Sequence, residues 1–277
     1  MEVLHIVVLA VIQGITEFLP ISSSGHLILP AILFGWPDQG LAFDVAVHVG
    51  SLLAVVIYFR RDIAALIAAW FYPLGVGSGS ANQDDDYKLA WFVVLGTVPA
   101  GLAGLLFHDF IELHLRSPAV IAATTIFFGL VLALADFRHR KLAPGSALNL
   151  RDLTLIMVLI IGLSQALALV PGTSRSGITI TAALFLGLSR LEAARFSFLL
   201  SIPIIVLSGG YKALSLMELQ AVPWAELIMG VSLSAISAYV CIHFFLNFIN
   251  RIGMMPFVYY RLALGGLLIG LIVMPSV

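Results

Sequence analysis

Charged residues are scarce in this chain of 277 residues. Asp, Glu, Lys and Arg make up only 10% of the sequence, against roughly 25% in an average soluble domain. Hydrophobic residues make up 61%, which predicts an integral membrane protein. The formal net charge of -1 provides no overall field that would attract an acidic polymer, so we expect no nucleic-acid partner.

The sequence also has only one cysteine, no Lys or Arg near its N-terminus and no nucleotide-binding motif. The single cysteine, Cys241, lies inside an apolar run, which excludes a disulfide framework and a thiolate metal cluster. The first apolar stretch contains Gln13 and Glu17 and follows no basic residue. We therefore expect it to belong to the mature fold and not to a cleaved signal peptide. The sequence has no GxxxxGK motif, which argues against an ATP-driven machine.

Long apolar runs are what the sequence has instead. A helix needs about 20 apolar residues to cross a bilayer, and six runs approach or exceed this length. They lie near residues 43–59, 89–107, 117–135, 195–211, 224–247 and 256–274. Four further apolar segments, near 3–19, 27–35, 153–170 and 178–188, form two pairs.

A serine-rich loop interrupts each of these pairs. The first motif is Gln13-Gly-Ile-Thr-Glu17-Phe-Leu-Pro-Ile-Ser-Ser-Ser-Gly-His26, and the second is Pro171-Gly-Thr-Ser-Arg-Ser-Gly-Ile-Thr179. Pro20 and Pro171 favour helix ends at these loops. Irregular polar backbone at membrane depth is tolerated only where it lines a protein cavity. Each pair therefore predicts a re-entrant hairpin whose loop contributes to a polar site.

The two loops also indicate an internal duplication. Pro20 aligns with Pro171, and Gly25 aligns with Gly177 after a one-residue insertion. In each half one hairpin is followed by three spans. Because three is an odd number of crossings, the second copy begins on the opposite side of the membrane and lies upside down relative to the first. The sequence therefore predicts an all-α integral membrane protein with six transmembrane helices and two re-entrant helix-loop-helix hairpins, arranged as an inverted-topology repeat. A single membrane domain covers residues 1–277, with repeat one at about 1–136, repeat two at about 150–277 and a hydrophilic loop at 75–87.

Lys and Arg are distributed unequally between the two predicted sides. One side has Arg60, Arg61, Lys88, Arg138, Arg140, Lys141, Arg151, Arg190 and Arg251, and the other has chiefly Arg116 and Lys212. Such an excess is typical of the cytoplasmic side. Both termini and the mouth of the first hairpin are then expected to face outward.

Gln13 and Glu17 lie four residues apart and share one face of the predicted first helix. A buried carboxylate requires a cation, a hydroxyl or a metal. Glu17 either ties two helices together, activates a hydroxyl or water, or ligates a divalent cation with help from Gln13. Carboxylate and amide oxygens suit magnesium or calcium.

Ser23 and His26 lie three residues apart at the start of a predicted helix. This spacing can bring a hydroxyl and an imidazole within reach of each other, and attack by serine needs a base and a group that orients it. We therefore expect a direct chemical role for His26. A lone histidine such as His48 is instead interpreted as a hydrogen-bonded core or interface residue.

Arg175 lies between Ser174 and Ser176, just before a predicted helix. A guanidinium matches phosphate oxygens with two parallel hydrogen bonds, and the free amides of a helix N-terminus add to anion binding. Thr179 is one turn further and can contribute a hydroxyl. A structural alternative is that Arg175 only neutralises Glu17. Together the two loops predict phosphoryl chemistry on a substrate that arrives through the membrane.

The two motifs, in this order, closely resemble those of the bacterial undecaprenyl pyrophosphate phosphatase family, also called the bacitracin-resistance type. The resemblance extends over essentially the whole chain. It implies hydrolysis of undecaprenyl pyrophosphate to undecaprenyl phosphate and inorganic phosphate, which recycles the lipid carrier for peptidoglycan and other envelope polymers. It also implies a bacterial cytoplasmic (inner) membrane protein with a site facing the periplasm, surrounded by membrane lipids.

The resemblance implies roles for individual residues as well. Ser23 corresponds to the proposed nucleophile, His26 to its acid/base partner, Glu17 to the activating residue and Arg175 to the phosphate clamp. Substrate-binding positions are Gln13, Ser22, Ser24, Ser174, Ser176 and Thr179. A magnesium or calcium ion is an implied cofactor, with Glu17 as its ligand. The oligomeric state stays open, as does the choice between a phosphoserine and direct attack by water.

A transporter is the alternative hypothesis, because broken helices that meet at the midplane are also a transporter design. On that interpretation Arg175 and the serines bind an anionic polyprenyl lipid and move it without hydrolysis. Anion binding alone needs no serine, histidine and glutamate set. A Ser23→Ala variant discriminates between the two, since a transporter should largely tolerate it.

Overall fold

Six long helices form the body of the protein. The computed structural model describes residues 2–37, 39–72, 83–143, 145–216 and 223–273. The long helices are α4 (Gly40–Tyr58), α6 (Gln83–Leu106), α8 (Pro118–His139), α11 (Arg190–Leu216), α12 (Trp224–Ile252) and α13 (Met255–Val273). Each is long and apolar enough to cross a membrane, which confirms the six predicted spans. The chain is thus a multi-pass, all-α membrane protein over the residues described.

Shorter helices complete the fold around the two loops. The first loop connects α1 (Val3–Phe18) to α2 (Ser23–Leu27) and α3 (Leu29–Phe34). The second follows α9 (Leu155–Ala166) and the 3-10 turn η3 (Leu167–Leu169) and leads into α10 (Arg175–Phe185). Helix α1 ends at Phe18 and the turn η3 ends at Leu169, each two residues before Pro20 or Pro171, where the prolines predicted helix ends.

Three short elements were not predicted. They are α5 (Arg60–Phe71), α7 (His108–His114) and the 3-10 turn η2 (Leu150–Asp152). The predicted hydrophilic loop at 75–87 is also wrong at its C-terminal end, because α6 already begins at Gln83. Asp84, Asp85 and Asp86 occupy its first turn, where carboxylates interact favourably with the helix dipole. Residues 75–82 lie outside the described residues.

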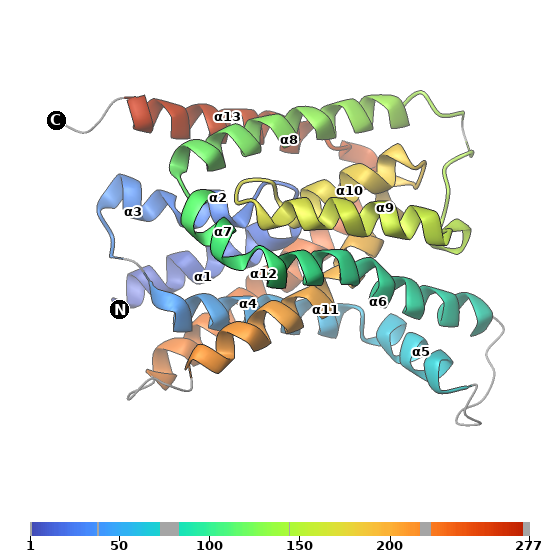
Figure 1. Ribbon diagram of the computed structural model, residues 1–277, viewed down its shortest axis with the longest axis horizontal. Helices are drawn as coiled ribbons and strands as arrows, with labels where there is room; N and C mark the ends of the chain where they lie inside the picture. Colours follow the sequence, from blue (N-terminus) through green and yellow to red (C-terminus); the bar gives the residue numbers. More distant parts are fainter. Residues whose placement is uncertain (1, 38, 73–82, 144, 217–222, 274–277) are drawn as a thin grey trace.

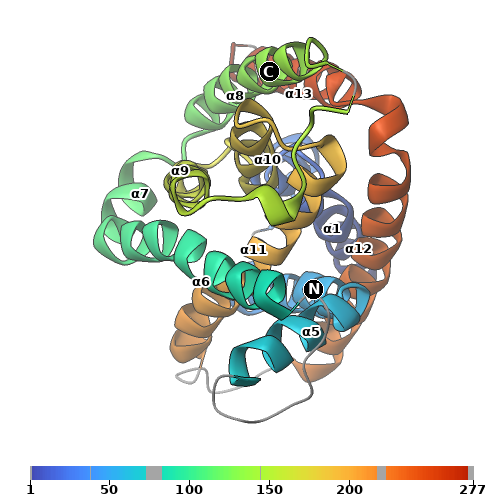
Figure 2. The same ribbon diagram turned by 90° about the vertical axis from the view of Figure 1, so that its right-hand side faces the viewer.

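The two loop-bearing helices lie inside the bundle. Figure 2 shows α1 and α10 near the centre, with α8, α13, α12 and α6 around them. Helix α12 packs along both α4 and α1, α6 packs along α9, and α8 lies between α13 and α10. Each broken segment is therefore covered by long helices from the other half of the chain.

The long helices also give the molecule two distinct ends. The N-terminal end of α1 and the C-terminal end of α13 lie on the left in Figure 1. Helix α5, the start of α6 and the end of α8 lie on the right. These right-hand elements contain Arg60, Arg61, Lys88, Arg138 and His139, as the predicted clustering of basic residues requires.

Glycines bring α1 and α9 unusually close to their neighbours. A Cβ on Gly14 of α1 would lie 2.5 Å from the Ser234 carbonyl oxygen of α12. A Cβ on Gly162 of α9 would lie 2.6 Å from the Gly96 carbonyl oxygen of α6. Small residues allow such close approach, which is how helices associate in a membrane. Both broken segments are thereby fixed against a long helix, and so are the loops that follow them.

Candidate active site

The two serine-rich loops have the same backbone conformation. Ser22 has φ 74° and ψ 99°, and Ser174 has φ 69° and ψ 114°. They are the only non-glycine residues with positive φ among those described. Each caps the helix that follows: the Ser22 hydroxyl accepts from the Gly25 amide at 3.3 Å, and that of Ser174 from the Gly177 amide at 3.1 Å. Such conformations cost about 1–3 kcal/mol and concentrate at functional sites.

The residues after these two caps also correspond. The Ser24 hydroxyl lies 3.1 Å from that of Ser22, and the Ser176 hydroxyl lies 3.3 Å from that of Ser174. The position between them differs, because it is Ser23 in the first loop and Arg175 in the second. One backbone arrangement therefore presents a hydroxyl on one side of the site and a guanidinium on the other.

The loops are hydrogen-bonded to each other. The Gly172 amide of the second loop donates to the Ser24 hydroxyl at 3.1 Å. In the opposite direction, the Ser176 hydroxyl donates to the Leu19 carbonyl oxygen at 2.8 Å. These bonds hold the loops together although they are about 150 residues apart in sequence. The predicted meeting of the two loops is confirmed.

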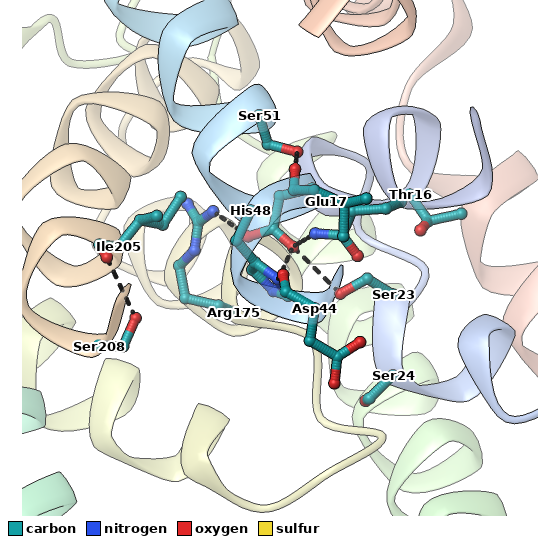
Figure 3. A network of polar contacts seen from close by, with 12 residues as sticks. Thr16, Glu17, Ser23, Ser24, Asp44, His48, Ser51, Arg175, Ile205 and Ser208 are labelled. Atoms are coloured by element: carbon teal, nitrogen blue, oxygen red, sulfur yellow. Dashed lines mark hydrogen bonds and ion pairs between the residues drawn. The ribbon is translucent and has the colours of Figure 1, made fainter. Parts of the chain in front are cut away.

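Glu17 is the point at which the predicted groups converge, as Figure 3 shows. Its Oε1 atom accepts from Arg175 Nη2 at 2.9 Å. Its Oε2 atom accepts from Gln13 Nε2 at 2.9 Å and from the Ser23 hydroxyl at 3.1 Å. The side chains of Glu17 and Arg175 are only 9% and 12% exposed, so the carboxylate has a cation, an amide and a hydroxyl as partners in a largely dry site.

The Arg175 side chain is oriented by further contacts. Its Nη1 atom donates to the Ser197 carbonyl oxygen of α11 at 3.1 Å, and the guanidinium carbon lies 5.8 Å from the centre of the Phe18 ring. The Thr179 hydroxyl lies 2.8 Å from the Arg175 carbonyl oxygen and 2.7 Å from the Ser197 hydroxyl. Thr179 is fully buried, so in this structure it supports the arginine. Its predicted contact with substrate stays a prediction.

His26 does not contact Ser23 in this structure. Its Nδ1 atom lies 2.6 Å from the Ser22 carbonyl oxygen, and its Nε2 atom lies 2.7 Å from the Tyr260 hydroxyl. Because a carbonyl oxygen can only accept, Nδ1 bears the proton. The imidazole thus links α13 to the strained cap residue of the first loop, whereas the hydroxyl of Ser23 is turned toward Glu17.

A different imidazole lies near Glu17. The Nε2 atom of His48, on α4, is 3.9 Å from Glu17 Oε2, and its Nδ1 atom lies 2.7 Å from the Asp44 carbonyl oxygen. Sequence analysis interpreted His48 as a hydrogen-bonded core or interface residue because it is a lone histidine in an apolar span. Only the packing of α4 beside α1 reveals that it faces the site.

Arg261 is a second buried arginine that sequence analysis missed. It is 0% exposed, and its guanidinium donates to the carbonyl oxygens of Pro20 at 3.5 Å and Gly172 at 3.0 Å, one in each loop. It also donates to the Thr125 carbonyl oxygen at 3.0 Å. No carboxylate pairs with it among the described residues. The signal was a cation within the apolar run 256–274, which marks a functional position in a membrane helix.

The donor set around Glu17 partly fits a divalent cation. The Oε1 atom of Gln13 is buried and has no hydrogen-bond partner in the described part of the chain, and it belongs to the residue that bonds Glu17. Amide and carboxylate oxygens are the ligands that magnesium and calcium prefer. The described residues contain no group of three or more His, Cys, Asp or Glu that could hold a metal alone. Further oxygens would have to come from a substrate.

The arrangement has the parts that acyl or phosphoryl transfer requires. A hydroxyl is hydrogen-bonded to a carboxylate that can take its proton, and a guanidinium that can stabilise an anion lies beside the same carboxylate. The pairing of Glu17 with Arg175 is the contact that the structural alternative predicts. The role of Arg175 as a phosphate clamp stays a prediction.

The chain is similar to known proteins over nearly its whole length. The family model described as bacitracin resistance protein BacA matches residues 6–267. An undecaprenyl-diphosphatase of Saccharophagus degradans is 62% identical over 272 residues, which cover 98% of this chain and 99% of the relative. One from Teredinibacter turnerae is 62% identical over 269 residues, covering 97% and 98%. Undecaprenyl-diphosphatase 1 of Pseudoalteromonas translucida is 56% identical over 274 residues, covering 99% and 98%.

Proposed function

Because this chain belongs to the bacitracin resistance protein BacA family, we propose that it is a membrane phosphatase that hydrolyses undecaprenyl diphosphate to undecaprenyl phosphate and inorganic phosphate. The observation that supports the chemistry is the Glu17 carboxylate, which bonds the Ser23 hydroxyl on one oxygen and Arg175 on the other. The names of the relatives supply the substrate, an anionic lipid whose reacting group fits a guanidinium.

We propose a serine-nucleophile mechanism with Glu17 as the base. The Ser23 oxygen attacks the terminal phosphorus while its proton passes to Glu17, 3.1 Å away. The bond between that phosphorus and the bridging oxygen breaks, and undecaprenyl phosphate leaves with the bond's electrons. Water then attacks the phosphoserine, which releases inorganic phosphate and frees Ser23. Direct attack by water, activated by Glu17, would use the same residues and give the same products.

Arg175 must exchange partners during this reaction. In the resting site it is paired with Glu17 at 2.9 Å, and an incoming diphosphate offers oxygens that can replace one contact. The guanidinium then stabilises the charge on the terminal phosphoryl group, which is where most catalysis of phosphoryl transfer originates. Release from Arg175 also makes the Glu17 carboxylate a stronger base for Ser23.

His26 is proposed to position the first loop and not to take the Ser23 proton directly. It bridges Tyr260 and the Ser22 carbonyl oxygen, and Ser22 is the residue with the strained backbone. The contact fixes the turn that aims Ser23 at Glu17. A role as acid/base partner would require the imidazole to leave both of its present contacts.

A magnesium or calcium ion is proposed to bind with the substrate. Gln13 Oε1 and the Glu17 carboxylate would provide protein oxygens, and the diphosphate would provide the rest. A bound divalent cation would neutralise phosphate charge and orient the diphosphate. The buried oxygen of Gln13, which has no partner among the described residues, supports this proposal.

We further propose that the two broken segments are re-entrant hairpins within an inverted repeat. The equal conformations of Ser22 and Ser174 support this, as does the reciprocal bonding of the loops. The close packing of α1 on α12 and of α9 on α6 has the same pattern. With the basic end of the molecule in the cytoplasm, the site of this inner-membrane protein would open toward the periplasm.

The lipid tail is proposed to lie along an apolar cavity between α1 and α12. The cavity has a volume of about 420 Å³, and its lining includes Ile15, Leu19, Phe244 and Phe257. Leu19 connects the cavity to the site, because its carbonyl oxygen accepts the hydrogen bond of Ser176. Hydrolysis here would recycle the lipid carrier used in peptidoglycan synthesis.

The test is phosphate release from undecaprenyl diphosphate by purified protein in detergent, with and without added magnesium or calcium. Wild type should release phosphate, and Ser23→Ala and Arg175→Ala should not. Unfolding midpoints in detergent close to that of wild type would show that both variants are folded. A folded wild type that binds the lipid without releasing phosphate would overturn the proposal and favour a lipid transporter.

A further inference from the structure

A second cavity lies away from the serine-rich loops, where the C-terminal ends of α8 and α10 meet. Its volume is about 290 Å³. Arg138, His139 and Lys141 line it from the end of α8, and Phe185 and Gly187 line it from the end of α10. No Asp or Glu contributes to this lining. A cavity with three basic side chains and no acidic one attracts anions.

Two of these basic residues have no compensating charge. The neighbouring Arg140 and Arg190 are neutralised by the buried Asp136, at 2.8 Å and 2.7 Å. By contrast, the side chains of Arg138 and Lys141 form neither an ion pair nor a hydrogen bond with any residue that the structure describes. The sequence places four cationic or potentially cationic side chains together at 138–141, the fold adds Arg190, and Asp136 pairs with only two of the five.

Aromatic rings hold the two uncompensated cations at the cavity. The Arg138 guanidinium carbon lies 5.9 Å from the centre of the Phe185 ring, and Lys141 Nζ lies 4.3 Å from the centre of the Phe137 ring. Cation–π contacts of this kind leave the hydrogen-bond donors of the cation free. Both side chains are therefore positioned without their donors being used.

The third basic residue contributes an unused polar atom. The Nδ1 atom of His139 is buried and has no hydrogen-bond partner within the described ranges. Leaving a buried polar atom unpaired costs free energy, and each native instance needs an explanation. His139 lines the adjacent cavity, so a turn of its ring would bring this nitrogen to an anion bound there. The carbonyl groups of the last turn of α10 do not compete for it, because Leu184 and Ala183 accept from the Gly187 and Leu188 amides.

The surroundings of the cavity are apolar and face outward. Phe137 is 56% exposed, and Leu142 and Phe185 are each 39% exposed. Phe137 lies in the last turn of α8, which is apolar and long enough to span the membrane, and Leu142 follows that helix. Phe185 is the last residue of α10, which ends beside it at the cavity. Exposed aromatic and aliphatic side chains at such an end contact lipid near the headgroups. The ligand should therefore combine an anionic group with apolar chains.

We infer that the cavity formed by Arg138, His139, Lys141 and Phe185 binds the phosphate headgroup of an anionic membrane lipid, a site separate from the one that hydrolyses the diphosphate. The guanidinium and ammonium groups bind the phosphate, and the lipid chains lie over Phe137 and Leu142. Basic pockets between membrane helices recognise acidic headgroups in this way. The site uses the uncompensated cations, the unpartnered imidazole nitrogen and the apolar rim together.

The experiment is native mass spectrometry of the full-length protein, released from neutral detergent after incubation with phosphatidylglycerol or with phosphatidylcholine. Wild type is compared with R138Q/K141Q, and with R60Q/R61Q as a matched control that removes two exposed cations of α5. A third variant, R138K/K141R, conserves both charges. A further sample contains millimolar inorganic phosphate as a soluble competitor.

Wild type should retain phosphatidylglycerol in preference to phosphatidylcholine. Retention should fall about tenfold or more in R138Q/K141Q and stay within about twofold of wild type in R60Q/R61Q. R138K/K141R should lie between wild type and R138Q/K141Q, because both charges are kept while Arg and Lys are not interchangeable over an aromatic ring. Equal retention by wild type and R138Q/K141Q would overturn the inference, as would an equal loss in R60Q/R61Q. Displacement of the lipid by inorganic phosphate would assign the cavity to a soluble anion instead. If R138Q/K141Q does not fold, the single variants R138Q and K141Q are compared in the same way.

Discussion

The two serine-rich loops are alike in backbone and unlike in chemistry. Ser22 and Ser174 share a left-handed conformation and the same cap to a glycine amide. Between the cap and the next serine, one loop has Ser23 and the other has Arg175. The two loops thus share a geometry and differ in the side chain between the two serines. In the proposed mechanism, this difference places a nucleophile and an anion-binding group on the two oxygens of Glu17.

The strongest way to test this division of roles is to remove the hydroxyl of the first loop. Ser23→Ala should lower phosphate release at least about a thousandfold, because loss of a nucleophile removes the chemical step. The measurement is phosphate release under substrate saturation. Ser232→Ala, at an exposed position on α12, is the matched control and should keep wild-type activity. Activity of Ser23→Ala within about tenfold of wild type would instead favour direct attack by water.

The second loop can be tested by keeping its charge and changing its shape. Arg175→Lys should lower phosphate release by about a hundredfold, because an ammonium group cannot form two parallel bonds with a phosphoryl group. Arg60→Lys makes the same exchange at the surface and should have no effect. Full activity of Arg175→Lys would show that a single positive charge suffices, and the proposed pair of parallel hydrogen bonds from Arg175 would be wrong.

The contact between the loops is tested at Arg261. Replacement of Arg261 by Met leaves the Pro20 and Gly172 carbonyl oxygens without this donor. Each buried group left unpaired lowers the free energy of unfolding by about 1–3 kcal/mol. We expect phosphate release to fall at least about tenfold, together with a decrease of at least about 5 °C in the unfolding midpoint in detergent. Arg261→Lys should lie between the two proteins. An unchanged midpoint for Arg261→Met would show that the loops do not depend on this bridge.

His26 provides a smaller test of how the first loop is held. Tyr260→Phe removes the hydroxyl that bonds His26 Nε2 at 2.7 Å, and we expect a decrease in phosphate release of about tenfold or less, because one net hydrogen bond contributes about 1 kcal/mol. Tyr259→Phe, at an exposed neighbouring position, should match wild type. A loss as large as that of Ser23→Ala would instead assign chemistry to this pair.

The smallest expected effect comes from the cap residues that the loops share. Ser22→Gly and Ser174→Gly each lose a cap but relieve the positive φ, so their unfolding midpoints should change little. Ser22→Ala and Ser174→Ala lose the cap and keep the strain, and each should cost about 1 kcal/mol. Thermal unfolding in detergent would measure all four. Clearly different costs at the two positions would show that the loops are alike in form only.

Much of the fold could be predicted because single segments determine it. An apolar run of sufficient length must cross the bilayer, which is why the six spans were found. Pro20 and Pro171 fixed two helix ends in the same local way. The amphipathic α5 was missed because it is too short and too polar to be found as a span.

Only the part of the site where the two serine-rich loops meet could be predicted from the sequence. Glu17, Ser23 and Arg175 converge because the two loops are hydrogen-bonded to each other. The partners of His26 and the position of His48 depend on how α13 and α4 pack against these loops, and no local pattern encodes that packing. Arg261 is the intermediate case, since its burial was readable from the apolar run but its carbonyl partners were not.

In the ion pair between Glu17 and Arg175, Glu17 occupies the guanidinium that is proposed to bind the substrate. A carboxylate already occupies the guanidinium at 2.9 Å, so every incoming anion competes against a ligand that is permanently tethered in place. A diphosphate, with more charge and more oxygens, competes better than a phosphate monoester. In the proposed mechanism, this competition disfavours the binding of weak anions and then favours release of the monoester product, so Glu17 itself would help to end each turnover.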